Sequence, residues 1–111
     1  MKMIHLAAIA ALGASAVLAH AATGDPQAAK KKTVMCEGCH GIPGYKSTFP
    51  DVYPVPRLGG QHPAYIVKAL EGYKSGERSH PTMRGIAAGL SEQDMADLAA
   101  HYGAQKQGER R

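Results

Sequence analysis

The 111-residue sequence has few of the large side chains that normally fill a protein core. It contains no tryptophan, one phenylalanine and five tyrosines, against 13 glycines and seven prolines. A single small domain of this composition buries little apolar surface, and such domains often depend on a cross-link, a metal or a bound cofactor. The composition therefore predicts that a group other than the side chains completes the core.

Other shortages limit the classes of function. Cys36 and Cys39 are the only cysteines, so a zinc site built from four cysteines is excluded. The basic residues form no stripe interleaved with aromatic residues, which argues against nucleic-acid binding. The formal net charge is a mild +4, and residues 30–32, all lysine, are its only cluster. This cluster is either a solvated helix face or a docking patch for an acidic protein.

No charged residue lies between Lys2 and Asp25. Residues 4–18 are almost wholly alanine, leucine, isoleucine and valine, and a small-x-small cleavage pattern follows at residues 19–21. A membrane span needs about 20 apolar residues, which is longer than this run. The pattern predicts a cleaved secretory signal peptide over residues 1–22 and hence a periplasmic protein, with an uncleaved membrane anchor as the alternative.

Helix signals occur at three places after this segment. Residues 25–36 begin with an N-cap aspartate followed by proline, and residues 63–74 begin with proline and end before glycine. Residues 92–104 follow Ser91, which forms a capping-box pattern with Asp94. The second and third segments also repeat apolar residues at i, i+3, i+4 and i+7. These signals predict three helices.

The chain between the first two helices is rich in turn-forming residues. Residues 41–60 hold eight glycines and prolines and no alternating run long enough to predict a strand. A loop this long in a compact domain is usually functional, and wrapping a flat cofactor would be such a function. We therefore expect an all-α domain over residues 23–106, followed by a polar tail over residues 107–111.

Cys36-Glu37-Gly38-Cys39-His40 has the spacing of a c-type haem attachment site. The two thiols can reach two vinyl groups on one edge of a porphyrin, and the histidine that follows can then bind the iron. The alternatives are a thioredoxin-like redox motif, a Cys36–Cys39 disulfide and a zinc site. The zinc site would need further ligands from His62, His80 or His101.

Four more segments carry a family resemblance. They are Gly24-Asp25-Pro26 before an alanine-rich helix, Pro56-Arg57-Leu58-Gly59-Gly60-Gln61, Tyr73-Lys74-Ser75-Gly76-Glu77-Arg78 followed by Met83, and Leu90-Ser91-Glu92-Gln93-Asp94. Together with the haem motif they resemble class I bacterial cytochromes c, of the c553 or c5 type or a single half of the dihaem c4 type. The resemblance covers residues 24–106. It implies the cytochrome c fold, with three to five short helices around one covalent haem c.

The second iron ligand must reach the face of the ring opposite His40. Met35 adjoins the attachment motif, and Met95 belongs to the apolar stripe of the last helix. Met83 lies in a segment interpreted as a loop, and it matches the axial methionine of the family. We therefore expect His40 and Met83 to be the axial ligands, and His80 or His62 would replace Met83 in a bis-histidine site.

The resemblance also implies contacts around the haem. The carbonyl of Pro56 is expected to accept a hydrogen bond from His40, and Leu58 and Ile86 are expected to pack against the ring. The candidates for pairing with the haem propionates are Arg57, Arg78 and Arg84. Tyr65 and Tyr73 are expected to be core aromatic residues.

Two filled axial positions would leave no iron site for a substrate. The predicted function is therefore one-electron transfer between a redox protein donor and a redox protein acceptor, by a monomer that is not an enzyme. A membrane-bound respiratory complex is among the expected partners. The main alternative is a haem-bearing electron-transfer subunit of a larger dehydrogenase or oxidase complex. A third class is a ligand sensor or peroxidase with an open sixth position.

Overall fold

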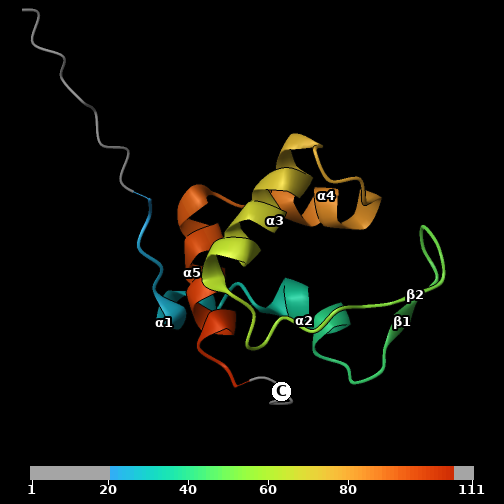
Figure 1. Cartoon of the computed structure of the whole chain (residues 1–111), viewed down its shortest axis with the longest axis horizontal. Coiled ribbons are helices and arrows are strands. Elements are labelled where there is room, and N and C mark those ends of the chain that lie inside the picture. Colours follow the sequence, from blue (N-terminus) through green and yellow to red (C-terminus); the bar gives the residue numbers. More distant parts are fainter. Residues whose placement is uncertain (1–20, 107–111) are drawn as a thin grey trace, which may run out of the picture.

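The structure is a computed structural model that describes residues 21–106. The predicted signal peptide lies outside the described residues except for Ala21 and Ala22, and the predicted tail lies wholly outside them. The elements are α1 (Pro26–Ala29), α2 (Val34–His40), β1 (Lys46–Ser47), β2 (Tyr53–Pro54), α3 (Pro63–Ser75), α4 (Pro81–Ala88) and α5 (Glu92–Gly103) (Figure 1). The expected fold of three to five short helices is confirmed, with a very small sheet in addition.

The core lies where α5 packs against α1 and α3. Its buried members are Ala29, Ile66, Leu90, Met95, Leu98, Ala99 and Tyr102. Most of them are small or aliphatic, as the composition requires. Met95 is only 2% exposed, which agrees with its predicted place in the apolar stripe of the last helix.

The two helices with the clearest sequence signals form close to their expected bounds. In α5, the Ser91 side chain accepts a hydrogen bond from the backbone of Asp94, and the Asp94 carboxylate accepts one from the backbone of Ser91. This is the predicted capping box. Helix α3 begins at Pro63, and Gly76 ends it in the left-handed conformation with φ of +87°. Glycine adopts that conformation without steric cost.

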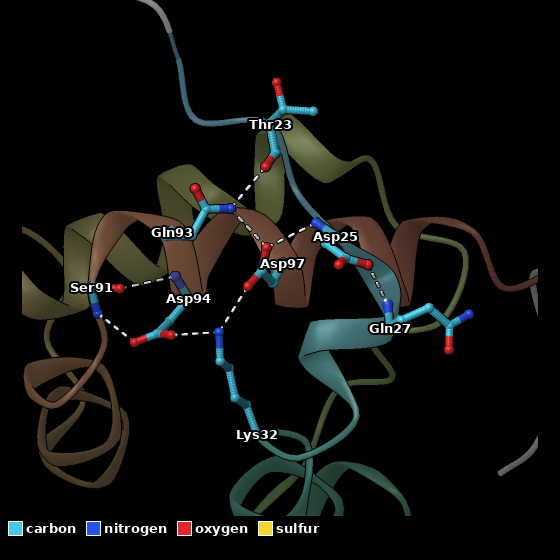
Figure 2. Close-up of polar contacts among 8 residues, drawn as sticks. All are labelled: Thr23, Asp25, Gln27, Lys32, Ser91, Gln93, Asp94 and Asp97. Carbon is cyan, nitrogen blue, oxygen red and sulfur yellow. Dashed lines mark hydrogen bonds and ion pairs between the residues drawn. The ribbon is translucent and has the colours of Figure 1, made fainter.

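The predicted single helix over residues 25–36 is wrong, because the chain turns at residues 30–33 between α1 and α2. Within this turn the Thr33 hydroxyl donates to the carbonyl of Lys30, which competes with the helical pattern. The turn also brings Lys32 to α5, where its ammonium lies 2.6 Å from Asp94 Oδ1 and 2.8 Å from Asp97 Oδ2 (Figure 2). The chain therefore forms two short helices, α1 and α2, with the turn that contacts α5 between them.

The segment that holds Met83 was expected to be a loop but is the helix α4. Pro81 occupies the first turn, where its missing N–H costs nothing. The side chain of His80 caps the helix by accepting a hydrogen bond from the backbone N–H of Met83. Histidine is not among the preferred N-cap residues, so sequence signals alone gave no start for this helix.

Between α2 and α3 the chain forms a hairpin, which includes β1 and β2, and then a segment over residues 55–62 that we call the strap. Strands β1 and β2 are antiparallel, with Lys46 opposite Pro54 and Ser47 opposite Tyr53. The chain then runs back past α2 to α3, and the N–H of Gly60 donates to the carbonyl of Tyr102 in α5.

In residues 21–106, no helix has both the length and the apolar character needed to span a membrane.

Candidate functional site

Helix α2 carries the two cysteines and the histidine of the attachment motif. Cys36 and Cys39 are three residues apart, so both side chains lie on one face of the helix. Both are free thiols and half-buried. Burial, as the largest effect, raises the pKa of the Cys36 thiol above its ordinary value. The Cys36 thiol is therefore in apolar surroundings, and both cysteines line the same space.

That space is a cavity of about 280 Å³, near the lower end of the sizes found for ligand sites. Helix α2 contributes Cys36, Cys39 and His40 to its wall, and α4 contributes Thr82, Met83 and Ile86. The two helices are separated in space (Figure 1). Further lining comes from α3, from α5 and from the strap that follows β2. The cavity thus joins the attachment motif to the predicted sixth ligand.

His40 is held by the strap. Its Nδ1 lies 2.6 Å from the carbonyl oxygen of Pro56, which is the hydrogen bond that the family resemblance implied. Because a carbonyl only accepts, Nδ1 carries the proton. This leaves the lone pair on Nε2 available for a metal, the usual arrangement of a metal-binding histidine.

Of the rivals of Met83, Met35 also lines the cavity, but it lies in α2 beside Cys36, on the wall that carries the attachment motif. Met95 is buried in the core, and His62 is an exposed residue that does not line the cavity. His80 does line the cavity, but both of its ring nitrogens are engaged. Nδ1 accepts from the backbone N–H of Met83 at 3.1 Å, and Nε2 is hydrogen-bonded to the hydroxyl of Tyr53. Neither nitrogen of His80 is free to bind a metal in this arrangement.

The other predicted contacts divide into those at the cavity and those away from it. Leu58, Ile86, Arg57 and Arg78 line the cavity, whereas Arg84 does not. Tyr65 and Tyr73 also line it, and Arg78 lies 5.7 Å and 4.9 Å from the centres of their rings. The expectation that Tyr65 is a core residue is wrong, because it is 50% exposed. Its hydroxyl instead accepts a hydrogen bond from Arg78 at 3.3 Å.

Two lining tyrosines were not singled out as site residues from the sequence. Tyr102 belongs to the apolar stripe of the last helix, which indicated a core position, and nothing in the sequence around Tyr53 indicated a role. The hydroxyl of Tyr102 is buried, and no hydrogen-bond partner for it occurs among residues 21–106. Burial, followed by the nearby Cys36, raises the pKa of this hydroxyl. A buried unpaired hydroxyl on a cavity wall is typical of a site that a bound group completes.

The alternatives to haem find no support in this arrangement. Nowhere in the described part of the chain do three or more histidine, cysteine, aspartate or glutamate residues gather into a group that could hold a metal ion, so the zinc site is wrong. The strands follow the motif and are antiparallel, whereas a thioredoxin-like motif needs a preceding strand in a βαβ unit. Two thiols, an imidazole and a thioether around one apolar cavity are the donor set that fits haem c.

Comparisons with known proteins point the same way. No family model matches the chain. It is 42% identical over 89 residues to cytochrome c4 of Pseudomonas aeruginosa, covering 80% of this chain and 42% of the relative. It is 35% identical over 86 residues to cytochrome c-554(548) of Halomonas halodenitrificans, covering 75% of this chain and 99% of that protein.

The same relationship holds in three dimensions. The solved structure of cytochrome c4 from Acidithiobacillus ferrooxidans matches with a TM-score of 0.60 and 26% identity, over 75% of this chain and 51% of that one. The chain therefore spans about half the length of the c4 relatives that it matches. Because it also matches nearly the whole of a small cytochrome c at 35% identity, the chain belongs to the cytochrome c family, within which it corresponds to a single half of a c4-type protein.

Proposed function

We propose that this cytochrome c is an exported one-electron carrier with a single haem c. In this proposal Cys36 and Cys39 would form the thioether bonds to the haem, and His40 and Met83 would bind its iron. The observation that carries the proposal is the cavity itself. Its α2 wall presents two thiols and an oriented imidazole, and its α4 wall presents a thioether.

Haem c supplies an iron that gains and loses one electron, and the chain's residues set the conditions for that step. The carbonyl of Pro56 keeps the proton of His40 on Nδ1 and orients the imidazole. The thioether of Met83 would be a soft ligand that favours Fe(II), so it would raise the reduction potential above that of a bis-histidine site. Apolar lining residues such as Leu58 and Ile86 exclude water and add to this effect.

The same arrangement favours electron transfer over catalysis. With His40 and Met83 bound to the iron, no coordination position is left for a substrate. The partners are then a redox protein donor and a redox protein acceptor, which exchange electrons with the haem without binding its iron. Slow binding of carbon monoxide or cyanide at neutral pH is expected. Fast binding would instead support a sensor or peroxidase with an open sixth position.

The test of the axial ligand compares two methionines by the same substitution. Met83→Leu should abolish the far-red charge-transfer band that an iron–thioether bond gives to the ferric protein. Met95→Leu should keep the band, because it replaces a buried core side chain by one of similar volume. The reverse pattern would overturn the assignment of Met83.

Export and assembly are tested on the native protein. The expected mature chain begins at Ala21 or Ala22 and is recovered in the periplasmic fraction as a monomer. The alternative is a haem-bearing subunit of a dehydrogenase or oxidase complex. Size-exclusion chromatography of a native extract separates the two. A free carrier elutes near its own mass, and a subunit elutes with the complex.

A further inference from the structure

His80 makes two hydrogen bonds that join α4 to the hairpin. Its Nδ1 accepts from the backbone N–H of Met83 at 3.1 Å, and its Nε2 meets the hydroxyl of Tyr53. A neutral imidazole has one acceptor nitrogen and one donor nitrogen. Since Nδ1 accepts, the proton lies on Nε2 and is donated to the oxygen of Tyr53. Both bonds are therefore satisfied by a single tautomer.

Aromatic rings hold the imidazole on two sides. The ring of Tyr53 meets that of His80 edge to face, with centres 5.3 Å apart, and the ring of Tyr73 does so at 6.1 Å. Such pairs add to the energy of burial. His80 is thus fixed between β2 and α3 while it caps α4.

We infer that His80 is a positioning residue that holds Met83 in place as an iron ligand. The inference rests on the proposed function, because the position of Met83 matters to the iron only if Met83 binds it. Helix α4 has eight residues, and a helix this short is marginal without tertiary contacts. Met83 is the third residue of this helix, in the turn that the His80 cap fixes.

The hairpin side of this arrangement reaches the other axial ligand too. Tyr53 lies three residues before Pro56, whose carbonyl holds His40. Residues 53–56 therefore contact His40 directly and Met83 through His80. One short segment of chain thus fixes the spacing between the two helices that carry the ligands.

The test measures how easily an external ligand displaces Met83. In the ferric holoprotein, His80→Ala should raise the affinity for cyanide about fivefold, the factor that corresponds to loss of a typical helix cap. It should also weaken the far-red thioether band. His80→Asn should give a cyanide affinity between those of the wild type and His80→Ala, because asparagine is a good N-cap residue but has no ring to reach Tyr53.

The matched control removes a cap far from Met83. Ser91→Ala takes the side-chain cap from α5 in the same way. It should lower the melting temperature of the protein but leave cyanide affinity and the far-red band unchanged. If Ser91→Ala raised cyanide affinity as much as His80→Ala, the effect would be one of general stability and the inference would be wrong.

A second pair of variants covers the case in which His80→Ala yields no holoprotein. Tyr53→Phe removes only the hydroxyl bonded to His80, and Tyr45→Phe removes a hydroxyl from another tyrosine near the hairpin that does not line the cavity. Tyr53→Phe should raise cyanide affinity, and Tyr45→Phe should not. Equal cyanide affinity in the wild type and Tyr53→Phe would overturn the inference alone. Absence of the far-red band from the wild type would overturn the Met83 assignment and the inference with it.

Discussion

Any side chain at position 24 would collide with the backbone of α5. A Cβ built on Gly24 would lie 2.0 Å from the carbonyl oxygen of Ala96 and 2.6 Å from its carbon. Backbone atoms in a helix cannot move aside as a flexible side chain can. Gly24 therefore allows the N-terminal segment to cross α5 in direct contact.

The substitution Gly24→Ala should destabilise the holoprotein by about 1–3 kcal/mol, the usual range for overpacking a well-packed site. The measurement is urea unfolding followed by circular dichroism. Gly85→Ala is the matched control, because nothing lies within 4 Å of its added Cβ. At that exposed helical position alanine should stabilise the protein by roughly 0.5–1 kcal/mol. Equal stability of the Gly24→Ala variant and the wild type would contradict the proposed crossing.

The functional roles of single residues could be predicted from the sequence to different degrees. Cys36, Cys39 and His40 were visible because their chemistry requires a fixed local spacing. The proposed role of Met83 depends on the family resemblance as well as on the residues around it. Tyr53 could not be found, because its contact with His80 joins residues 27 positions apart and leaves no local pattern.

At the scale of elements, an ionic cluster joins the turn after α1 to α5. Lys32 bridges Asp94 and Asp97, and Asp97 also accepts hydrogen bonds from the backbone N–H of Asp25 and the side chain of Gln93 (Figure 2). The hydrogen bond from Lys32 is the largest effect on both carboxyl groups. It helps to lower the pKa of Asp94 and of Asp97 from 3.8 to about 2.

This cluster gives stability a defined dependence on pH. A carboxyl group whose pKa is lowered by folding stabilises the folded state above its unfolded pKa, and this contribution is lost as the pH falls through the folded pKa. The melting temperature should therefore decline between about pH 4 and pH 2. Asp97→Asn should be less stable at pH 7 and should show a shallower decline.

The control for this titration is an exposed ion pair. Lys68 and Glu71 lie 3.0 Å apart on the surface of α3, with side chains 81% and 44% exposed. Such pairs contribute little to stability. Glu71→Gln should therefore follow the wild-type curve. Parallel curves for the wild type and Asp97→Asn would show that the cluster does not carry the acid dependence.

The elements that the sequence predicted are those bounded by local signals. Helix α3 begins at Pro63 and ends before Gly76, and α5 begins after the N-cap Ser91. Each of these residues favours a helix start or end through contacts within a single turn. The break after α1 depends on Lys32 reaching α5, and α4 depends on a histidine cap held by Tyr53. These tertiary contacts decided the structure where propensity was weak.

At the scale of the whole molecule, the cavity explains how a protein with so small a hydrophobic core can be stable. The wall of the cavity includes Ile66, Leu98 and Tyr102, which also belong to the hydrophobic core. A bound haem would therefore extend that core across to α2 and α4. The haem would thus be the additional group that we expected from the shortage of large side chains.

The chain without haem should accordingly fail to fold. Protein made in a host that lacks cytochrome c maturation should show weak helical circular dichroism and no cooperative melting, because a domain this small lacks sufficient core of its own. The holoprotein in the same buffer is the reference. A haem-free chain as helical and as cooperative as the holoprotein would contradict this view of the core.

We propose above all that Cys36 and Cys39 bind one haem c covalently. The most direct test of this proposal is the intact mass of the mature protein after acid-acetone extraction, with the double variant Cys36→Ala/Cys39→Ala as control. The wild-type protein should stay red and be heavier than its polypeptide by the mass of one haem, whereas the variant should retain none. Extraction of the colour from the wild type, leaving the mass of the polypeptide alone, would contradict the proposal.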